Sequence, residues 1–260
     1  MTGTGPTGGG GTALRRMAKR VLPAATRRRL RRALTVWPPV GAVRFGSLRR
    51  LTPFSRRYGF ERGTPIDRHY IENFLARHAG EESYGTGDIR GRVLEVGGDV
   101  YARRFGSAVS QIEVLHDSDT RPSATLVADL TRPETVPEDA FDCVICTQTL
   151  HFIYDVGAAL RTLHRALKPG GVLLATVPGI SQVCRPERDI WGDYWRLTTL
   201  SARRLLEEAF PAANVTVESY GNVLTSAAFL YGVAAEELKP EELDPRDPDY
   251  ELLIAIRAVK

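Results

Sequence analysis

The chain has 260 residues, of which 43% are hydrophobic, so it can bury one substantial core but has little room for a second full domain. No run of about 18 apolar residues occurs, which disfavours a membrane span, and three cysteines are too few for a disulfide scaffold and fit a reducing cytoplasm. The net charge of +4 is uneven, because residues 1–60 hold 14 of the 35 Lys and Arg and none of the 31 Asp and Glu. Residues 61–260 therefore carry 21 basic and 31 acidic side chains, a net charge of −10.

The first 60 residues are expected to form a disordered, basic extension. Residues 1–12 are mostly Gly and Thr and lack the apolar surface that would offset the entropy of ordering them. Residues 13–34 mix three apolar residues at helical spacing with nine basic ones, and Pro23 divides the segment. This arm could bind a membrane surface, a carrier protein or a polyanion, or it could be a solvated extension. Interrupting arginines disfavour a cleaved signal peptide. We place the folded domain at residues 61–260.

Pro65 is placed to open the first helix of that domain, whose apolar face includes Tyr70 and Phe74. Short apolar strands then alternate with amphipathic segments: strands are predicted at 92–96, 112–115, 141–147 and 172–177, and a helix at 156–167. A helix at 199–210, a strand at 214–220, a long apolar segment at 223–238 and a final strand at 250–260 follow. This alternation predicts an α/β fold, a doubly wound, Rossmann-like, mostly parallel sheet with helices on both faces.

Ligands of such sheets bind at the carboxyl ends of the strands, so the residues that follow each strand are the candidates for a site. Gly97 and Gly98 follow the first strand and allow a tight turn in which backbone N–H groups approach a ligand. Asp117 follows the second strand, where a carboxylate can accept hydrogen bonds from both hydroxyls of a ribose. Asp119 is a nearby alternative for the same contact.

Two further strand ends extend this rim. Asp129 and Leu130 follow a short apolar run and are suited to contacting the edge and the face of an adenine. Thr147 ends the fourth strand, and Gln148 and His151 follow it at the same rim. Each element alone is common in loops and cores, and it is their order and spacing that predict a nucleoside site.

These segments resemble the motifs of the class I S-adenosylmethionine-dependent methyltransferases, in the type 11-like branch that acts on small molecules. VLEVGG (93–98) resembles the first motif of the family, VADL (127–130) its adenine-side acidic motif, and FDCVICTQTLHFIYD (141–155) its fourth-strand motif. ALRTLHRALKPGGVLLATVPG (159–179) resembles the helix, turn and strand that follow. The resemblance implies a seven-stranded sheet of order 3-2-1-4-5-7-6, S-adenosylmethionine as the cofactor, and a cofactor site that includes Glu95 with the strand-end residues.

The first motif departs from the alternate glycines usual in the family, because Asp99 and Tyr101 occupy the next two positions. A side chain at either position restricts φ and fills space, so the loop must follow a different path. S-adenosylmethionine has no phosphate to fit beneath the loop, so the departure is easier to reconcile with this cofactor than with a dinucleotide. Asp99 could face the positive sulfonium or amino group, or it could cap the following helix.

Methyl transfer from a sulfonium is an in-line displacement that depends on alignment and needs no protein nucleophile. A hydroxyl acceptor must also lose a proton to a base. His151 is the candidate, because it alone of the five histidines follows a core strand at the expected rim. The alternative is a histidine that is satisfied inside the strand-to-helix turn.

The segment RDIWGDYWRLTT (188–199), after the fifth strand, is the candidate acceptor loop. It is similar to a D-Y-x-R-x-T run found in methyltransferases that modify sugars and natural products, matched here by Asp193, Tyr194, Arg196 and Thr198. Asp193 or Arg196 could orient a polar acceptor, or the two could pair and hold the loop. Trp191 and Trp195 could form a stacking wall.

The leading hypothesis is O-methylation of a sugar or secondary metabolite, a small-molecule acceptor, in natural product biosynthesis. Tyr70 could close over the cofactor, and residues 223–238 could form a lid or a homodimer face. An RNA acceptor recruited by the basic extension is disfavoured by the acidic domain, and a non-catalytic binding protein is a third reading. Cys143 and Cys146 form a C-x-x-C without a second pair and would face opposite sides of a strand, so no metal site is predicted.

Overall fold

The computed structural model describes residues 23, 26, 38, 42–80 and 86–260. The chain divides into two compact units, Met1–Leu51 and Thr52–Lys260. In the first unit the described residues include one 3-10 turn, η1 (Gly46–Leu48). The predicted disorder of residues 1–12 lies outside the described residues, as does nearly all of the predicted arm at 13–34. The second unit begins at Thr52, ahead of the predicted start at residue 61.

The second unit is built on a seven-stranded sheet of order β3-β2-β1-β4-β5-β7-β6, which confirms the predicted topology. Strands β1 to β5 are parallel to one another, and β7 is antiparallel to both β5 and β6. The strands are β1 (Gly91–Val96), β2 (Val109–His116), β3 (Leu126–Val127), β4 (Phe141–Thr147), β5 (Leu167–Pro178), β6 (Val215–Tyr220) and β7 (Leu253–Val259). The carboxyl ends of five parallel strands therefore share one edge of the sheet.

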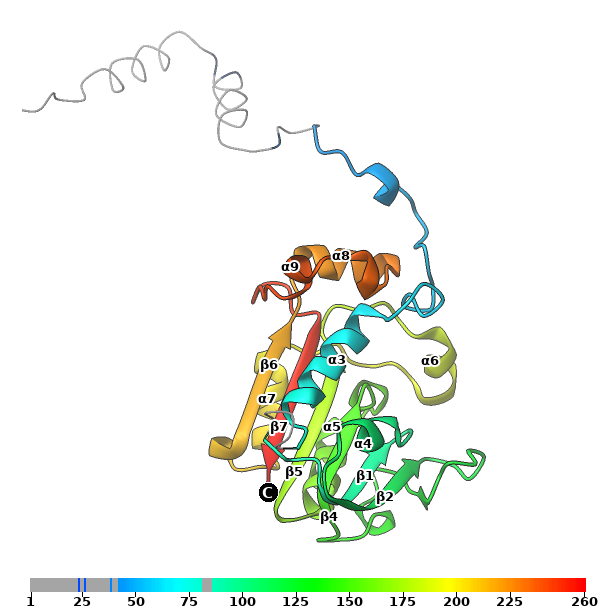
Figure 1. Ribbon diagram of the computed structural model, residues 1–260, viewed down its shortest axis with the longest axis vertical. Coiled ribbons are helices and arrows are strands. Elements are labelled where there is room, and N and C mark those ends of the chain that lie inside the picture. Colours follow the sequence, from blue (N-terminus) through cyan, green and yellow to red (C-terminus); the bar gives the residue numbers. More distant parts are fainter. Residues whose placement is uncertain (1–22, 24–25, 27–37, 39–41, 81–85) are drawn as a thin grey trace, which may run out of the picture. The chain divides into compact units, whose positions relative to one another are not determined.

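The helices of this unit confirm the alternation with strands that the sequence predicts. They are α3 (Ile66–Arg77), α4 (Val100–Phe105), α5 (Val156–Ala166), α6 (Arg185–Trp191), α7 (Thr199–Glu207), α8 (Val223–Tyr231) and α9 (Pro240–Leu243), with 3-10 turns η3 (Pro133–Thr135), η4 (Leu150–Phe152), η5 (Ala212–Asn214) and η6 (Ala235–Glu237). α8 and α9 lie beyond the end of the sheet at which β6 finishes (Figure 1). Thr198 caps α7, since its hydroxyl accepts a hydrogen bond from the Ser201 amide. The predicted apolar segment 223–238 breaks at Gly232, which ends α8 in the left-handed conformation.

The sheet separates two apolar clusters, because successive side chains of a strand point to opposite faces. Val93 lies in the cluster with α3, α4 and α8, and its neighbour Leu94 lies in the cluster with α5 and α7. Cys143 and Cys146 divide in the same way, as predicted, and both thiols are free and fully buried. Burial raises the pKa of Cys146 to about 12, so these thiols pack as small apolar groups.

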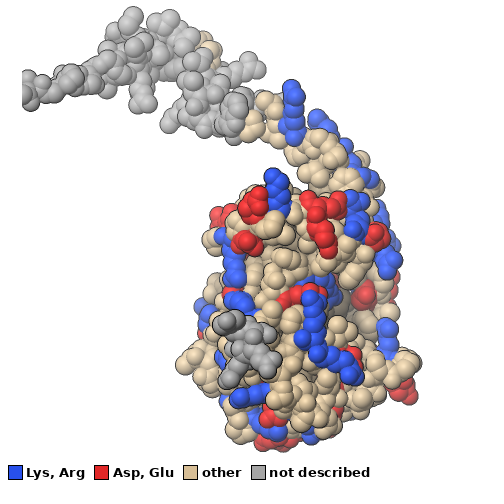
Figure 2. Space-filling model, viewed as in Figure 1, with Lys and Arg blue, Asp and Glu red and all other residues tan. Residues whose placement is uncertain are grey.

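Charged side chains of both signs are interspersed over the face of the second unit that Figure 2 shows. Several charged side chains of this unit form ion pairs between distant segments, such as Arg62 with Glu237 and Arg257 with Asp88. Among the described residues, no helix has the length and apolar character needed to cross a membrane.

Candidate active site

A cavity of about 1150 Å³ opens where β1, β2, β4 and β5 end. It is lined by residues that follow these strands, by α3, by the loop after β5 and by residues 58–65. A pocket for one small ligand commonly measures about 300–1000 Å³. The cavity therefore has room for a cofactor and a second reactant together.

The turn after β1 forms one wall and leaves space for a ligand. Gly97 has φ +89°, a conformation that favours glycine. A Cβ placed on Gly97 or on Gly98 would meet nothing within 4 Å, so the space beside this turn is open. The Glu95 carboxylate accepts hydrogen bonds from the Tyr101 amide at 3.2 Å and the Ala102 amide at 2.7 Å. Glu95 thus reaches from β1 to satisfy the first turn of α4.

Asp99 and Tyr101, the departures from the usual motif, leave the cavity open. The Asp99 carboxylate accepts a hydrogen bond from Arg103 Nε at 2.6 Å, one turn along α4, and makes no side-chain cap. Asp99 is also absent from the cavity wall among the described residues, so both predicted roles for this side chain are wrong. Tyr101 does line the cavity, with its ring tilted against Phe105 and its hydroxyl 3.3 Å from Arg68 Nη1.

The ends of β2 and β3 bring the predicted nucleoside contacts to the same cavity. Asp117 follows β2 and lines the wall, and its Oδ2 accepts a hydrogen bond from Trp191 Nε1 at 2.5 Å. Asp129 and Leu130 line the cavity beyond β3. The Asp129 carboxylate accepts hydrogen bonds at 2.8 Å from both the amide and the hydroxyl of Thr131, which fix its orientation. Asp119, the alternative to Asp117, is exposed and outside the described wall.

The end of β4 supplies Thr147, Gln148 and His151 to the wall, as predicted. Gln148 has φ +48°, a left-handed conformation that costs a residue with a Cβ roughly 1 kcal/mol or more. Its amide donates to the Thr176 carbonyl at 2.8 Å, which holds this strained residue where β4 and β5 finish. Backbone strain of this kind gathers at functional sites.

His151 lies in η4 with only 6% of its surface exposed. Burial lowers its pKa to about 4, while the Asp193 carboxylate acts in the opposite direction. The imidazole is therefore neutral at pH 7. Its Nδ1 is buried and has no hydrogen-bond partner among the described residues. A histidine satisfied within its turn, the alternative reading, would not leave this nitrogen unpaired.

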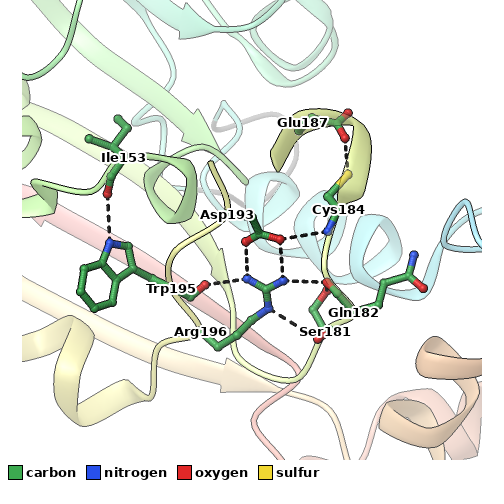
Figure 3. Close-up of polar contacts among 8 residues, drawn as sticks. All are labelled: Ile153, Ser181, Gln182, Cys184, Glu187, Asp193, Trp195 and Arg196. Carbon is green, nitrogen blue, oxygen red and sulfur yellow. Dashed lines mark hydrogen bonds and ion pairs between the residues drawn. The ribbon is translucent and has the colours of Figure 1, made fainter. Parts of the chain in front are cut away.

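Asp193 and Arg196 satisfy each other within the loop after β5 (Figure 3). Arg196 Nη1 and Nη2 donate to the two Asp193 oxygens at 2.6 and 2.9 Å, and the Asp193 side chain has no exposed surface. Arg196 also donates to the carbonyls of Gln182 and Trp195, and Asp193 accepts from the Cys184 amide at 2.9 Å. Arg196 lines the cavity, but the geometry of the pair matches the reading in which it holds the loop.

Two aromatic side chains that were predicted to contact the cofactor or the acceptor, Tyr70 and Trp195, pack away from the described cavity wall. Tyr70 is 3% exposed, stacks on Tyr220 and donates its hydroxyl to the Leu243 carbonyl at 2.9 Å. Trp195 packs beside the core and donates Nε1 to the Ile153 carbonyl at 3.0 Å. Among the described residues, neither lines the cavity, so the predicted lid role of Tyr70 and the stacking role of Trp195 are wrong. Of the two tryptophans predicted to form a stacking wall, Trp191 lines the cavity.

Several cavity residues were not predicted from the sequence, and three of them have side chains suited to binding a ligand. Arg68 on α3 lies in the cavity wall beside Tyr101, and its guanidinium suits a carboxylate. Tyr58 also lines the cavity, has φ +59° and stacks on Phe229. His116, the last residue of β2, has a buried Nε2 without a partner among the described residues. Arg68 could have been found as a basic residue on the helix that precedes β1. Tyr58 was missed because it lies within residues 1–60, which were assigned to the extension.

Comparison with known proteins places this site in a family. Residues 84–175 match the family described as "Methyltransferase domain". This part of the chain is similar to a methyltransferase domain. Together with the strand order, the match gives S-adenosylmethionine as its cofactor. The residues fit that molecule, because the space beside Gly97 and Gly98 is open. In addition, among the described residues, one buried ring nitrogen of His116 and one of His151, both in the cavity wall, have no hydrogen-bond partner.

The methyltransferase domain is similar to several known proteins. The "Uncharacterized protein YafE" of Escherichia coli (strain K12) is 47% identical over 60 residues, 22% of this chain and 28% of that protein. The "Ubiquinone/menaquinone biosynthesis C-methyltransferase UbiE" of Pectobacterium carotovorum subsp. carotovorum (strain PC1) is 30% identical over 95 residues, 35% of this chain and 38% of that protein. The chain thus spans well under half the length of these two curated relatives.

Two solved structures are also similar to this chain. An S-adenosylmethionine-dependent methyltransferase from Mesorhizobium loti is 16% identical, with 75% of this chain and 98% of that chain covered and a TM-score of 0.45. The N-methyltransferase NodS from Bradyrhizobium japonicum WM9, solved with S-adenosyl-L-homocysteine, is 14% identical, with 76% and 88% covered and a TM-score of 0.45.

Proposed function

We propose that the protein methylates a hydroxyl group of a small molecule, a sugar or a secondary metabolite of natural product biosynthesis. S-adenosylmethionine supplies the electrophilic methyl group on its sulfonium. In this proposal Gly97, Gly98 and Glu95 shape the wall for the cofactor, Asp117 holds the ribose, and Asp129 and Leu130 contact the adenine. Thr147 and Gln148 complete that wall, and Arg68 binds the carboxylate of the methionine part of the cofactor.

The observation that carries the proposal is the state of His151. The imidazole is buried in the wall of the cavity, and its pKa of about 4 keeps it neutral at physiological pH. A neutral imidazole can accept the proton of a hydroxyl during its attack, whereas an imidazolium cannot. The low pKa weakens His151 as a base but keeps nearly every molecule in the competent form. An amine or a carbon acceptor would make less use of this group.

We call the part of the cavity lined by the loop after β5 and by residues 58–65 its acceptor half, and this half carries neutral polar groups. Tyr58, Gln182 and Tyr194 line this half. Of the charged side chains of this loop that line the cavity, Arg196 is paired with Asp193, and the Glu187 carboxylate accepts a hydrogen bond from the Cys184 thiol. We assign the Asp193–Arg196 pair to positioning the loop, and the neutral groups to the acceptor. Such a surface suits an uncharged, hydroxylated ring.

The test has two stages. Calorimetry of the full chain with S-adenosylhomocysteine should give a dissociation constant in the micromolar range, and no heat at millimolar concentration would contradict an enzymatic role. Protein that binds is then incubated with S-adenosylmethionine and a panel of monosaccharides, glycosides and phenols, each matched to its O-methylated or deoxy analogue. Mass spectrometry should detect a methylated product only where the free hydroxyl is present. Transfer to amines with none to hydroxyls would contradict the proposal.

A further inference from the structure

The loop that links β5 to α7 crosses the cavity and returns. It leaves β5 at Pro178, forms α6, and rejoins the domain at the Thr198 cap of α7. In the sheet β5 is separated from β2 by β1 and β4. A contact between this loop and the end of β2 therefore spans the whole crevice in which the cofactor is proposed to bind.

Both ends of α6 are tied to a single hub, the Asp193–Arg196 pair. The Cys184 amide, just before α6, donates to Asp193 Oδ2 at 2.9 Å. Arg196, just after α6, donates to Asp193 and to the Gln182 carbonyl at 2.6 Å. Figure 3 shows the Asp193 carboxylate between Cys184 and the Arg196 guanidinium. The hub fixes where α6 begins and where the chain returns from it.

The last residue of α6, Trp191, makes the crossing contact. Its Nε1 donates to Asp117 Oδ2 at 2.5 Å, and its ring lies 6.1 Å from the Phe152 ring, which stands 3.8 Å from the His151 ring. Gly192 follows with φ +96°, and a Cβ there would meet the Tyr194 ring at 2.2 Å. The glycine turn therefore ends α6 where the indole can reach Asp117.

We propose that Trp191 is a cofactor-binding residue that closes the nucleoside pocket and orients the Asp117 carboxylate toward the ribose. This rests on the proposed function, in which Asp117 holds the ribose. A carboxylate has two oxygens and accepts several hydrogen bonds. With Oδ2 held by Trp191, Oδ1 and the remaining lone pairs face the two ribose hydroxyls. The loop that carries the acceptor contacts thus also completes the cofactor site, and cofactor binding favours the closed arrangement of that loop.

The measurement is the affinity of the full chain for S-adenosylhomocysteine by calorimetry. Trp191→Phe keeps an aromatic ring and removes the N–H donor, and it should weaken binding about ten-fold, as expected for losing a hydrogen bond to a charged group. Trp195→Phe is the matched control, because it removes an indole donor from the same loop outside the cavity wall. Its affinity should stay within about two-fold of the unmodified chain.

A double-mutant cycle separates a direct contact from a general loosening of the loop. In an Asp117→Ala background the Trp191→Phe substitution should have almost no further effect, because the partner carboxylate is already absent. The chain has three tryptophans, Trp37, Trp191 and Trp195, so their fluorescence gives a second readout. The emission change on adding S-adenosylhomocysteine should persist in Trp195→Phe and be largely lost in Trp191→Phe.

Different results separate the two proposals. If the unmodified chain does not bind S-adenosylhomocysteine, the proposed function fails and this inference fails with it. If the unmodified chain binds and Trp191→Phe binds equally well, only the role of Trp191 is overturned. An equal loss in both backgrounds of the cycle would also overturn it, since the loss would not pass through Asp117. Thermal unfolding of each variant verifies that the loss of affinity occurs in folded protein.

Discussion

The two halves of the cavity are built by different means. On the cofactor side, the contact residues follow directly from strand ends: Gly97 donates its amide to the Leu115 carbonyl at 3.0 Å, and Gln148 donates to Thr176 at 2.8 Å. On the acceptor side, the loop after β5 is held by side chains, chiefly Asp193 and Arg196. The sheet thus fixes the first half, while the second depends on a few polar contacts. Apart from Trp191, which contacts Asp117 across the crevice, the acceptor half is the part in which single substitutions should change function without disturbing the cofactor.

A further contact ties the acceptor half to residues outside the sheet. Gln182 Nε2 donates to the Arg56 carbonyl at 2.9 Å, and Tyr58 lies close by in the cavity wall. The Thr64 amide and hydroxyl both donate to the Glu236 carboxylate, which joins this segment to η6. The acceptor side is therefore assembled from three segments that are distant in the sequence, and the cofactor side mainly from consecutive strand ends.

Asp193→Ala should break the acceptor half most strongly. The variant leaves the Arg196 guanidinium without its partner, and about three quarters of the Arg196 side chain is buried. Breaking a buried pair costs about 3 to 5 kcal/mol, and the partial exposure of Arg196 places the expected loss of unfolding free energy near 3 kcal/mol. Urea unfolding measures this loss, and calorimetry should show binding of S-adenosylhomocysteine by the folded variant.

Asp189→Ala is the matched control for this substitution. Asp189 pairs with Arg188 on the same helix, and both side chains are about half exposed. Removing such a surface pair should change the unfolding free energy by less than about 1 kcal/mol. Equal losses in the two variants would show that the Asp193–Arg196 pair does not hold the loop.

His151→Ala tests the boundary between the two halves. Loss of a general base should lower the rate of O-methyl transfer by about 100-fold or more. Binding of S-adenosylhomocysteine should be almost unchanged, because the proposed cofactor contacts lie at other residues. Single-turnover kinetics measure the chemical step apart from product release. A rate that barely falls would indicate an amine or carbon acceptor, or a different base.

The same histidine predicts how stability depends on pH. Its pKa is about 4 in the folded chain, where burial, Arg196 and Arg68 oppose the charge, against about 6.5 when unfolded. Between these values the unfolded chain binds a proton that the folded chain does not, so stability falls as the pH falls. From pH 7 to pH 5 this contributes a loss of about 2 kcal/mol.

His151→Gln removes the titrating group and keeps a polar side chain at the same place. Unfolding free energies of the two proteins are compared in urea at pH 7 and pH 5. The unmodified protein should lose more stability than the variant, by the amount assigned to His151, while all other carboxylates and histidines contribute equally to both. Parallel pH curves would place His151 in a solvated environment and remove the basis for its low pKa.

Most of the fold could be predicted because strands and their order depend on local patterns. The fourth strand was predicted with its observed bounds, Phe141–Thr147, since an apolar run bounded by polar residues leaves little choice. The parallel strands then bring Asp117, Asp129 and Gln148 to one edge without further information. The residues of the cofactor half can therefore be predicted from the sequence wherever they immediately follow a strand.

Positions that depend on packing between distant segments were not predictable. Tyr70 and Arg68 lie two residues apart on α3 and so differ by roughly 200° around the helix axis. Periodicity shows that both cannot face the cavity, but it does not say which one does. The choice follows from the contact of the Tyr70 hydroxyl with the Leu243 carbonyl, 173 residues away. The same reasoning applies to Asp99, whose expected capping role is taken by Glu95 on the neighbouring strand.

Asp117→Ala sharpens the comparison from the cofactor side. The carboxylate at the end of β2 should accept ribose hydroxyls, and losing hydrogen bonds to a charged group costs about 1.5 kcal/mol or somewhat more, roughly a ten-fold loss of affinity for S-adenosylhomocysteine. Asp119→Ala, two residues away and outside the described wall, is the matched control and should bind normally. Because Asp117 belongs to the half fixed by the sheet, its loss should leave the unfolding free energy nearly unchanged, in contrast to Asp193→Ala. Calorimetry and urea unfolding of both variants decide the point: a loss of affinity that appears only in Asp119→Ala would move the ribose contact there, and a loss in neither would assign it to backbone groups.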